Sequence, residues 1–237
     1  MNPGNNLNPY KMKKLIFSLT LLTTAYFSNS QSLPVQVGFH GGINLNTIRG
    51  NEIADQYSSA GMGFNVGLDL KVCLTERFRL ILTPGYENLS IYYKSVDLAD
   101  ESGYLIGRGD LKHNFNYINI PILAEVLLGR KSNFKLSAGP FLGVFIDDNI
   151  SYEVREEFPS NPEPMMFSVS NKSNFGINYG IAVGTGIIIP INKKLDFNVE
   201  LRDEFGIANL NKSETSSVHK IRANSFNLLL GISFQIN

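Results

Sequence analysis

Eight segments of this chain alternate apolar and polar residues with a period of two, as the stretch LDFNVELR at 195–202 illustrates. Successive side chains of a β-strand point to opposite faces, so this pattern predicts strands with one apolar and one polar face. The segments are 35–46, 62–72, 77–93, 117–126, 134–147, 175–189, 195–202 and 226–236. A chain patterned in this way is all-β, and its fold depends on what the apolar faces contact.

The connections between these segments alternate in length along the chain. The short ones are 75–76, 129–133 and 191–194, and the long ones are 50–60, 94–110, 150–173 and 211–223. Transmembrane barrels have short periplasmic turns and long extracellular loops, whereas a soluble sandwich has no reason to sort its connections by parity. The order therefore predicts an eight-stranded antiparallel transmembrane β-barrel. Both termini are expected in the periplasm, and the four long connections outside the cell.

Charged residues of both signs occupy the polar faces of the segments. They include Asp69, Lys71, Arg79, Glu87, Glu125, Lys135, Asp147, Asp196, Glu200 and Arg202. Such groups are tolerated at membrane depth when they face inward and pair with one another. The interior of an eight-stranded barrel is just wide enough for its own side chains. We therefore expect paired charges to fill the interior and to leave no open channel.

A basic and then apolar segment precedes the first predicted strand. Lys11, Lys13 and Lys14 come before the apolar run 15–25, and small or polar residues follow at 28–30. This order is typical of a secretory signal peptide, and the run is shorter than the ~20 residues of a spanning helix. We expect 1–31 to be an upstream extension plus signal peptide, with the true start at Met12. Residues 32–237 are then the barrel domain in the outer membrane.

Charge and motif content argue against several kinds of site. The 21 basic residues balance the 21 acidic ones, so no nucleic-acid partner is expected. Cys73 is the single cysteine of the sequence, which excludes an internal disulfide and a CxxC site. The sequence contains no HExxH and no GxxxxGK motif. We therefore predict no catalytic, cofactor-binding or metal-binding residues.

The three histidines define the alternative hypothesis, an enzyme that modifies outer-membrane lipid. Such an enzyme needs a serine, a histidine and an acid within hydrogen-bond reach near a strand end. His40 falls on the interior face, whereas His113 and His219 lie in or beside the long connections. Ser90 is the serine that His113 would need, but no motif joins them. A solvated histidine at the barrel rim is the simpler interpretation.

Two further patterns carry structural predictions. Glu200 and Glu204 flank Arg202 on one face, which favours an ion-pair network over an acid–base pair. Pro121 and Pro140 fall inside predicted strands. Because proline removes a donor from the ladder and a closed barrel has no edge, both predict bulges or bends.

The longest connection, 150–173, is acidic, carries three prolines and ends in the apolar triplet 165–167. One interpretation is a solvated loop whose apolar end starts the next strand. The other is a segment that binds a partner at the cell surface.

Three short motifs resemble those of the PorT-like outer-membrane barrel domains of Bacteroidetes. They are YINIPILAE at 117–125, GFHGGINL at 38–45 and AGPFLG at 138–143. The resemblance spans about 32–237, and it departs from the family's habits at Glu125, where lysine is common, and at the non-aromatic C-terminal residue Asn237. It implies a barrel without a defined activity in most members, and a role in protein secretion for PorT itself.

The sequence therefore supports a structural or accessory outer-membrane barrel that serves protein secretion or surface attachment, with the lipid-modifying enzyme as the alternative. The expected partners are outer-membrane lipid, the barrel-assembly machinery and a secretion or surface partner at 150–173. No cofactor is expected.

Overall fold

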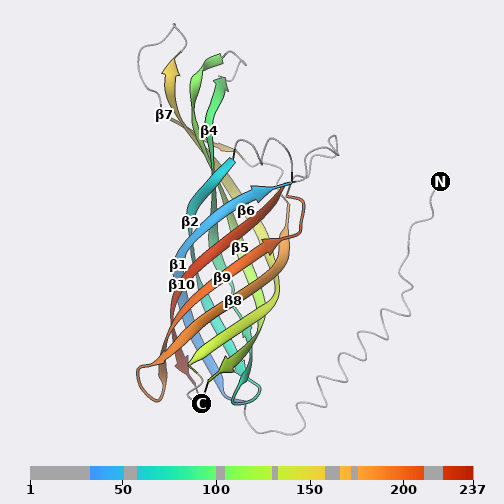
Figure 1. Cartoon of the computed structure of the whole chain (residues 1–237), viewed down its shortest axis with the longest axis vertical. Helices are drawn as coiled ribbons and strands as arrows, with labels where there is room; N and C mark the ends of the chain where they lie inside the picture. The colour runs from blue at the N-terminus through green and yellow to red at the C-terminus, as the bar shows by residue number, and fades with distance from the viewer. Residues whose placement is uncertain are drawn as a thin grey trace, which may run out of the picture. The chain divides into compact units, whose positions relative to one another are not determined.

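The computed structural model describes residues 33–50, 58–99, 105–129, 133–157, 166–171, 176–210 and 221–236. Strands dominate this part of the chain, and all their pairings are antiparallel (Figure 1). The strands are β1 (Val35–Arg49), β2 (Ser58–Cys73), β3 (Phe78–Leu82), β4 (Gly85–Ala99), β5 (Leu105–Leu128), β6 (Phe134–Glu157), β7 (Met166–Asn171), β8 (Asn178–Pro190), β9 (Leu195–Gly206) and β10 (Arg222–Gln235). Within the described ranges, no helix has both the length and the apolar character needed to cross a membrane.

The sheet closes into a ring because its first and last strands pair along their whole length, from Gln36 opposite Gln235 to Arg49 opposite Arg222. β3 and β4 share one position of the ring, since each pairs with both β2 and β5. β7 extends the sheet on β6 beyond the stretch that β8 occupies. The described strands thus fill eight positions, and the predicted eight-stranded antiparallel barrel is confirmed.

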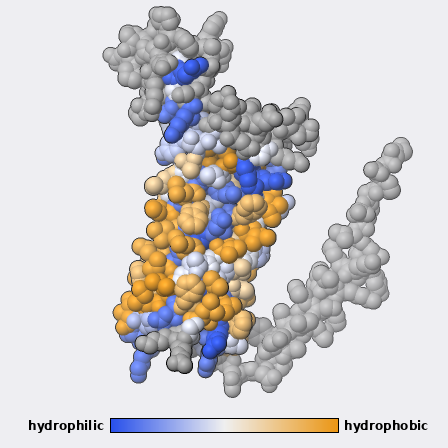
Figure 2. All heavy atoms as spheres, viewed as in Figure 1, coloured by the Kyte–Doolittle hydropathy of each residue, from blue (hydrophilic) through white to orange (hydrophobic). Residues whose placement is uncertain are grey.

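Apolar side chains cover the outside of the ring, and polar side chains face inward. On β2, Val66 and Leu68 are 52% and 63% exposed, whereas Asn65 and Asp69 are 5% and 8% exposed. The same alternation covers the visible wall of the barrel with apolar side chains (Figure 2). A protein in water would reverse this polarity, so the wall has the composition expected of a barrel surrounded by lipid.

Two of the long connections prove to be largely strand, which corrects the sequence prediction. β4 continues to Ala99 and β5 begins at Leu105, so most of 94–110 is a paired hairpin. β6 continues to Glu157 and β7 occupies 166–171, so only the middle of 150–173 lies between strands. The alternation in these extensions is short, with Val96 and Leu98 in one and Ile150, Tyr152 and Val154 in the other, and many charged residues surround it.

Of the bulges or bends predicted at the two prolines, the bulges are absent. Pro121 pairs with Phe141, and the same register resumes at Ala124 opposite Ala138. The register shifts of this strand pair lie elsewhere, at Arg108/Gly109 and at Asn116/Tyr117. No extra residue is inserted at either proline, so the strands pass them without a change of face.

The shift at Asn116/Tyr117 changes which aspartate faces inward. Tyr117 pairs with Phe145, but Asn116 pairs with Asp147, so Ile146 is the extra residue of a bulge. Asp147, predicted to face the interior, instead accepts a hydrogen bond from Asn116 Nδ2 at 2.5 Å on the outer face. Asp148, 1% exposed, takes the inward position. Alternation alone cannot detect this, because a one-residue bulge inverts every later face of its strand.

Candidate functional site

Side chains fill the barrel interior, which is the candidate site because most of the buried charge lies there. The buried charged residues on the inner face of the barrel strands are Asp69, Lys71, Glu87, Glu125, Lys135, Asp148, Glu200, Arg202 and Glu204. The alternation assigned all of them to the interior except Glu204 and Asp148. Glu204 belongs to the ion-pair network predicted around Arg202, and Asp148 faces inward because of the bulge at Ile146. Burial of this many charges is tolerable when each is paired.

A continuous ion-pair network crosses the interior from β3 to β9. Arg79 Nη1 lies 3.6 Å from Glu125 Oε1, and Lys135 Nζ lies 3.4 Å from Glu125 Oε2. Lys135 also pairs with Glu200, whose other oxygen accepts a hydrogen bond from Arg202 Nε at 2.8 Å. The predicted ion-pair network around Arg202 is therefore present, and it ties strands on opposite sides of the ring together.

Small residues on β8 leave room for this network. Gly180, Ala182 and Gly184 alternate along the inner face of the strand, as the sequence predicts. A Cβ on Gly184 would lie 2.5 Å from Ser137 Oγ and 2.9 Å from Glu200 Oε1. A larger residue at this position would displace the side chains of Ser137 and Glu200.

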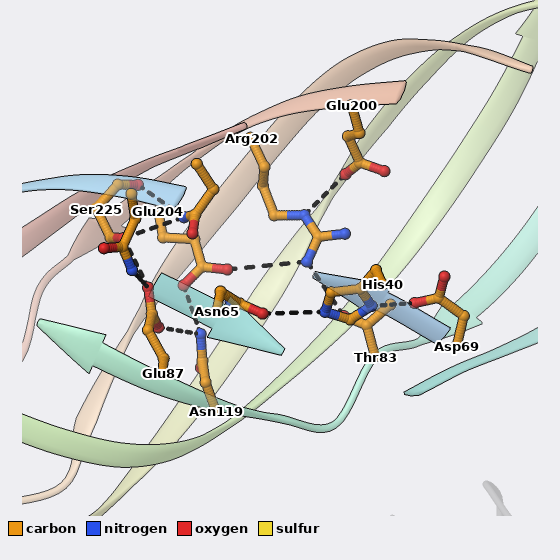
Figure 3. Close-up of polar contacts among 12 residues, drawn as sticks. His40, Asn65, Asp69, Thr83, Glu87, Asn119, Glu200, Arg202, Glu204 and Ser225 are labelled. Carbon is orange, nitrogen blue, oxygen red and sulfur yellow. Dashed lines mark hydrogen bonds and ion pairs between the residues drawn. The ribbon is translucent and has the colours of Figure 1, made fainter. Parts of the chain in front are cut away.

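Two carboxyl groups meet at the level next to this network (Figure 3). Asn119 Nδ2 donates to Glu87 Oε2 at 2.8 Å and to Glu204 Oε2 at 2.5 Å. Ser225 Oγ donates to Glu87 Oε1 at 2.6 Å, and Arg202 Nη1 lies 4.0 Å from Glu204 Oε1. These contacts use buried protein donors, so the pair resembles a structural cross-link between strands more than a catalytic acid–base pair.

His40 lies in the interior, as predicted, and both of its ring nitrogens are engaged. Nδ1 lies 2.8 Å from Asp69 Oδ1 and Nε2 lies 3.1 Å from Asn65 Oδ1 (Figure 3). The side chain is 5% exposed, so a substrate arriving from solvent would not reach it. His40 therefore joins β1 to β2 and is poorly placed to act as a general base.

The serine and histidine of the enzyme hypothesis lie on opposite faces of the sheet. Ser90 pairs with Asn114, and its hydroxyl donates to Asn114 Oδ1 at 2.5 Å. His113 pairs instead with Ile91 and lies 2.8 Å from Asp148 Oδ2 on the inner face. Because neighbouring residues of a strand point in opposite directions, Ser90 cannot serve His113 as a nucleophile. His219 lies outside the described residues.

An apolar cluster fills the end of the interior from which the long connections extend. Its buried members are Ile48, Leu89, Ile91, Phe115, Tyr117, Leu210 and Ala223. Phe145 packs against it, with its ring edge-on to Tyr117 at 5.6 Å between centroids. The polar faces of the sequence do not predict this cluster, although Leu89 and Ile91 share the face of Glu87 and so had to point inward.

The side chains of the interior are arranged for packing and ion pairing. The described residues contain no group of three or more histidine, cysteine, aspartate or glutamate side chains that could hold a metal ion. The inner face instead supplies paired charges, bonded amides and two apolar clusters, the second formed by Ile81, Leu123, Phe141 and Ala182. This arrangement stabilises a closed barrel.

Comparison with known proteins places this geometry in a family. A family model described as "Outer membrane protein beta-barrel domain" matches residues 27–236. No curated protein sequence matches the chain.

Among solved structures, Neisserial surface protein A (NspA) is similar at 14% identity and a TM-score of 0.43, over 85% of this chain and 97% of that one. OprG from Pseudomonas aeruginosa is similar at 14% identity and a TM-score of 0.41, over 86% and 97%. The outer membrane protease OmpT from Escherichia coli is similar at 11% identity and a TM-score of 0.40, over 88% and 100%.

Proposed function

The chain belongs to the outer membrane protein beta-barrel domain family, and from this premise we propose that it is a non-enzymatic structural or accessory subunit. In this proposal the closed barrel anchors a projecting sheet at the cell surface, where the sheet binds a partner in protein secretion or surface attachment. The PorT-like resemblance of 117–125 favours secretion.

The filled interior is the observation that carries the first half of the proposal. Glu125, Lys135, Glu200 and Arg202 bond across the ring at one level, and the apolar cluster around Tyr117 fills the end beyond them. A solute would have to break buried ion pairs to pass, and breaking one such pair costs about 3–5 kcal/mol. This favours an anchor over a conducting channel.

The projecting sheet supports the second half. β6 runs from Ile146, an exposed apolar residue of the wall, to Glu157. At ~3.3 Å per residue this extension measures about 35 Å along the strand. β4, β5 and β7 accompany it, and together they rise beyond the other strands (Figure 1). Among the described residues, β7 pairs with β6 alone, and β4 beyond Tyr93 pairs with β5 alone, so both are edges of the sheet. A sheet edge can bind another protein by adding a strand.

The opposite faces of Ser90 and His113 weigh against the lipid-modifying alternative. His40 is no better candidate for the general base of such an enzyme, because Asp69 and Asn65 bond both of its ring nitrogens. We therefore do not assign a reaction to the barrel.

Shortening the β6–β7 hairpin tests the proposal. Glu153 and Met166 are cross-strand partners, so replacing 154–165 with Asn-Gly should close the hairpin with a two-residue turn. The control is Lys193→Gly, which changes the exposed turn at the other end of the barrel. Each protein would be purified from outer membranes in mild detergent, and the co-purified proteins quantified by mass spectrometry.

We expect the wild type and the control to retain the same partner and the shortened chain to lose it, with equal amounts of folded barrel. Equal recovery of every co-purified protein from all three would contradict the proposed role of the sheet. Stable single-channel conductance of the pure wild-type barrel in planar bilayers would contradict the closed anchor.

A further inference from the structure

Two arginines stand side by side on the outer face of the barrel, at the end from which the hairpins extend. Arg49 on β1 and Arg222 on β10 are cross-strand partners. Their neighbours Ile48 and Ala223 are 8% and 4% exposed and belong to the interior cluster. Since side chains alternate along a strand, both guanidinium groups lie on the outside.

Arg49 is held in place across β10. Its Nη2 donates to the carbonyl oxygen of Gly206 at 2.7 Å, and its Cζ lies 3.7 Å from the centre of the Phe205 ring. This is cation–π geometry, and Gly206 is the one hydrogen-bond partner of the five guanidinium donors among the described residues. The side chain is thus oriented in advance by contacts that do not neutralise its charge.

Arg222 has no hydrogen-bond or ion-pair partner among the described residues, and the Nε atoms of both arginines are buried and unbonded. The nearest outward carboxylate along β9 is Asp203, which pairs in register with Phe226. Asp203 makes no hydrogen bond or ion pair with any part of the chain that the structure describes. Two like charges held together with no counter-ion among the described residues form a site that attracts an anion.

The position of the pair indicates which anion. Directly below it the outer wall becomes apolar, with Leu45, Phe205 and Phe226 exposed by 50%, 48% and 47%. Arg49 lies four residues from Leu45, roughly 13 Å along the strand. Polar lipid headgroups occupy this level when acyl chains cover the wall below.

We propose that Arg49 and Arg222 bind the phosphate of a membrane-lipid headgroup, with the acyl chains of that lipid over Phe205 and Phe226. This rests on the membrane-anchor role proposed above. Guanidinium groups suit the site because their planar donors engage two oxygens of one phosphate, which lysine cannot do. With the long connections outside the cell, the lipid belongs to the outer leaflet.

The test uses the full barrel, refolded in dodecyl maltoside, a detergent without phosphate. Lipid A carrying two phosphates is titrated against it, and bound lipid is counted by native mass spectrometry. Fully dephosphorylated lipid A and inorganic phosphate are titrated in parallel. The variants are Arg49→Gln with Arg222→Gln, and Arg222→Gln alone, which breaks no hydrogen bond or ion pair to a described residue. The control, Lys193→Gln with Lys194→Gln, removes the same charge from the exposed turn at the opposite end.

We expect one phosphorylated lipid A to bind the wild type and the control with affinities within about twofold of each other. The affinity of the double variant should be lower by about tenfold or more, and the affinity of Arg222→Gln should lie between those of the wild type and the double variant. Dephosphorylated lipid A should bind the wild type as weakly as phosphorylated lipid A binds the double variant, and inorganic phosphate at equal concentration should not displace the lipid.

Three outcomes would overturn the proposal: equal binding by the wild type and Arg222→Gln, equal binding of the two lipids, or displacement by inorganic phosphate. Displacement would make the pair a site for free phosphate. Gel mobility before and after boiling separates these failures from failure of the membrane anchor. If every variant shows a mobility shift and lipid binding is unchanged, only the proposed lipid site is contradicted. If the wild type shows no mobility shift, the membrane anchor itself is contradicted.

Discussion

Replacing Arg202 with alanine removes the cation that joins the two halves of the interior network. Its Nε donates to Glu200 Oε1 at 2.8 Å, its Nη1 donates to Thr83 Oγ1 at 3.2 Å, and Nη1 also lies 4.0 Å from Glu204 Oε1. The side chain is 3% exposed. Water therefore cannot take over these contacts without entering the barrel.

The magnitude follows from what remains after the change. The network of Glu87, Glu125, Glu200 and Glu204 would keep two cations, Arg79 and Lys135, and both of these contact Glu125. Glu204 would lose its cationic partner altogether. Leaving a buried charge without its partner costs about 3–5 kcal/mol, so we expect Arg202→Ala to lower the free energy of unfolding by that amount.

Urea unfolding in lipid vesicles measures this change. The chain has no tryptophan, so far-UV circular dichroism and gel mobility follow the transition. Lys193→Ala, in an exposed turn, is the control and should shift stability by less than about 0.5 kcal/mol. The double variant Arg202→Ala with Glu204→Gln should be more stable than Arg202→Ala, because it removes the carboxylate that loses its cation. A loss below about 1 kcal/mol for Arg202→Ala would place these groups in water and refute the closed interior.

The remaining predictions concern the wall, the closure and the topology. Val66→Arg should lower the free energy of unfolding by about 2–4 kcal/mol and impair assembly, because it puts a charge against lipid. Asn65→Ser, which removes an interior amide, should lower it less. Equal unfolding midpoints of the two variants would show that the strand faces are misassigned. The mature chain in detergent should migrate differently before and after boiling, because a closed ring resists SDS at room temperature; a soluble, folded monomer without detergent would contradict the membrane wall. In a Cys73→Ser background, a membrane-impermeant maleimide should label Ser160→Cys in intact cells, and it should label Asn192→Cys only after the outer membrane is opened. The reverse result would invert the proposed topology.

A chemical label suits this test of orientation better than a protease. An irregular loop at 150–173 would make Arg155 an exposed site for trypsin, but Arg155 lies within β6, which is paired with β5 on either side of it. Proteases cut extended, unpaired backbone. A label placed in the connection 158–165 avoids the paired strand.

Local pattern was enough to predict the barrel itself. A period of two, short and long connections in alternation, and charges on one face are properties of residues a few positions apart, and they follow from strand geometry alone. They correctly assigned Asn65 and Glu200 to the interior and Val66 to the wall. The interior position of the glycines of β8 followed from the same periodicity.

The partners within the site were decided by the closed ring. Whether Asp147 or Asp148 faces inward depends on one bulge, and whether Glu87 meets Glu204 depends on bringing β4 opposite β9. Arg49 reaches Phe205, 156 positions along the chain (205 − 49), because β10 lies between them in the ring. Such contacts depend on the register of every strand pair at once, and a shift of one residue in any pair would exchange its faces. Alternation along the sequence specifies the face of each side chain, and only closure of the sheet selects its neighbour.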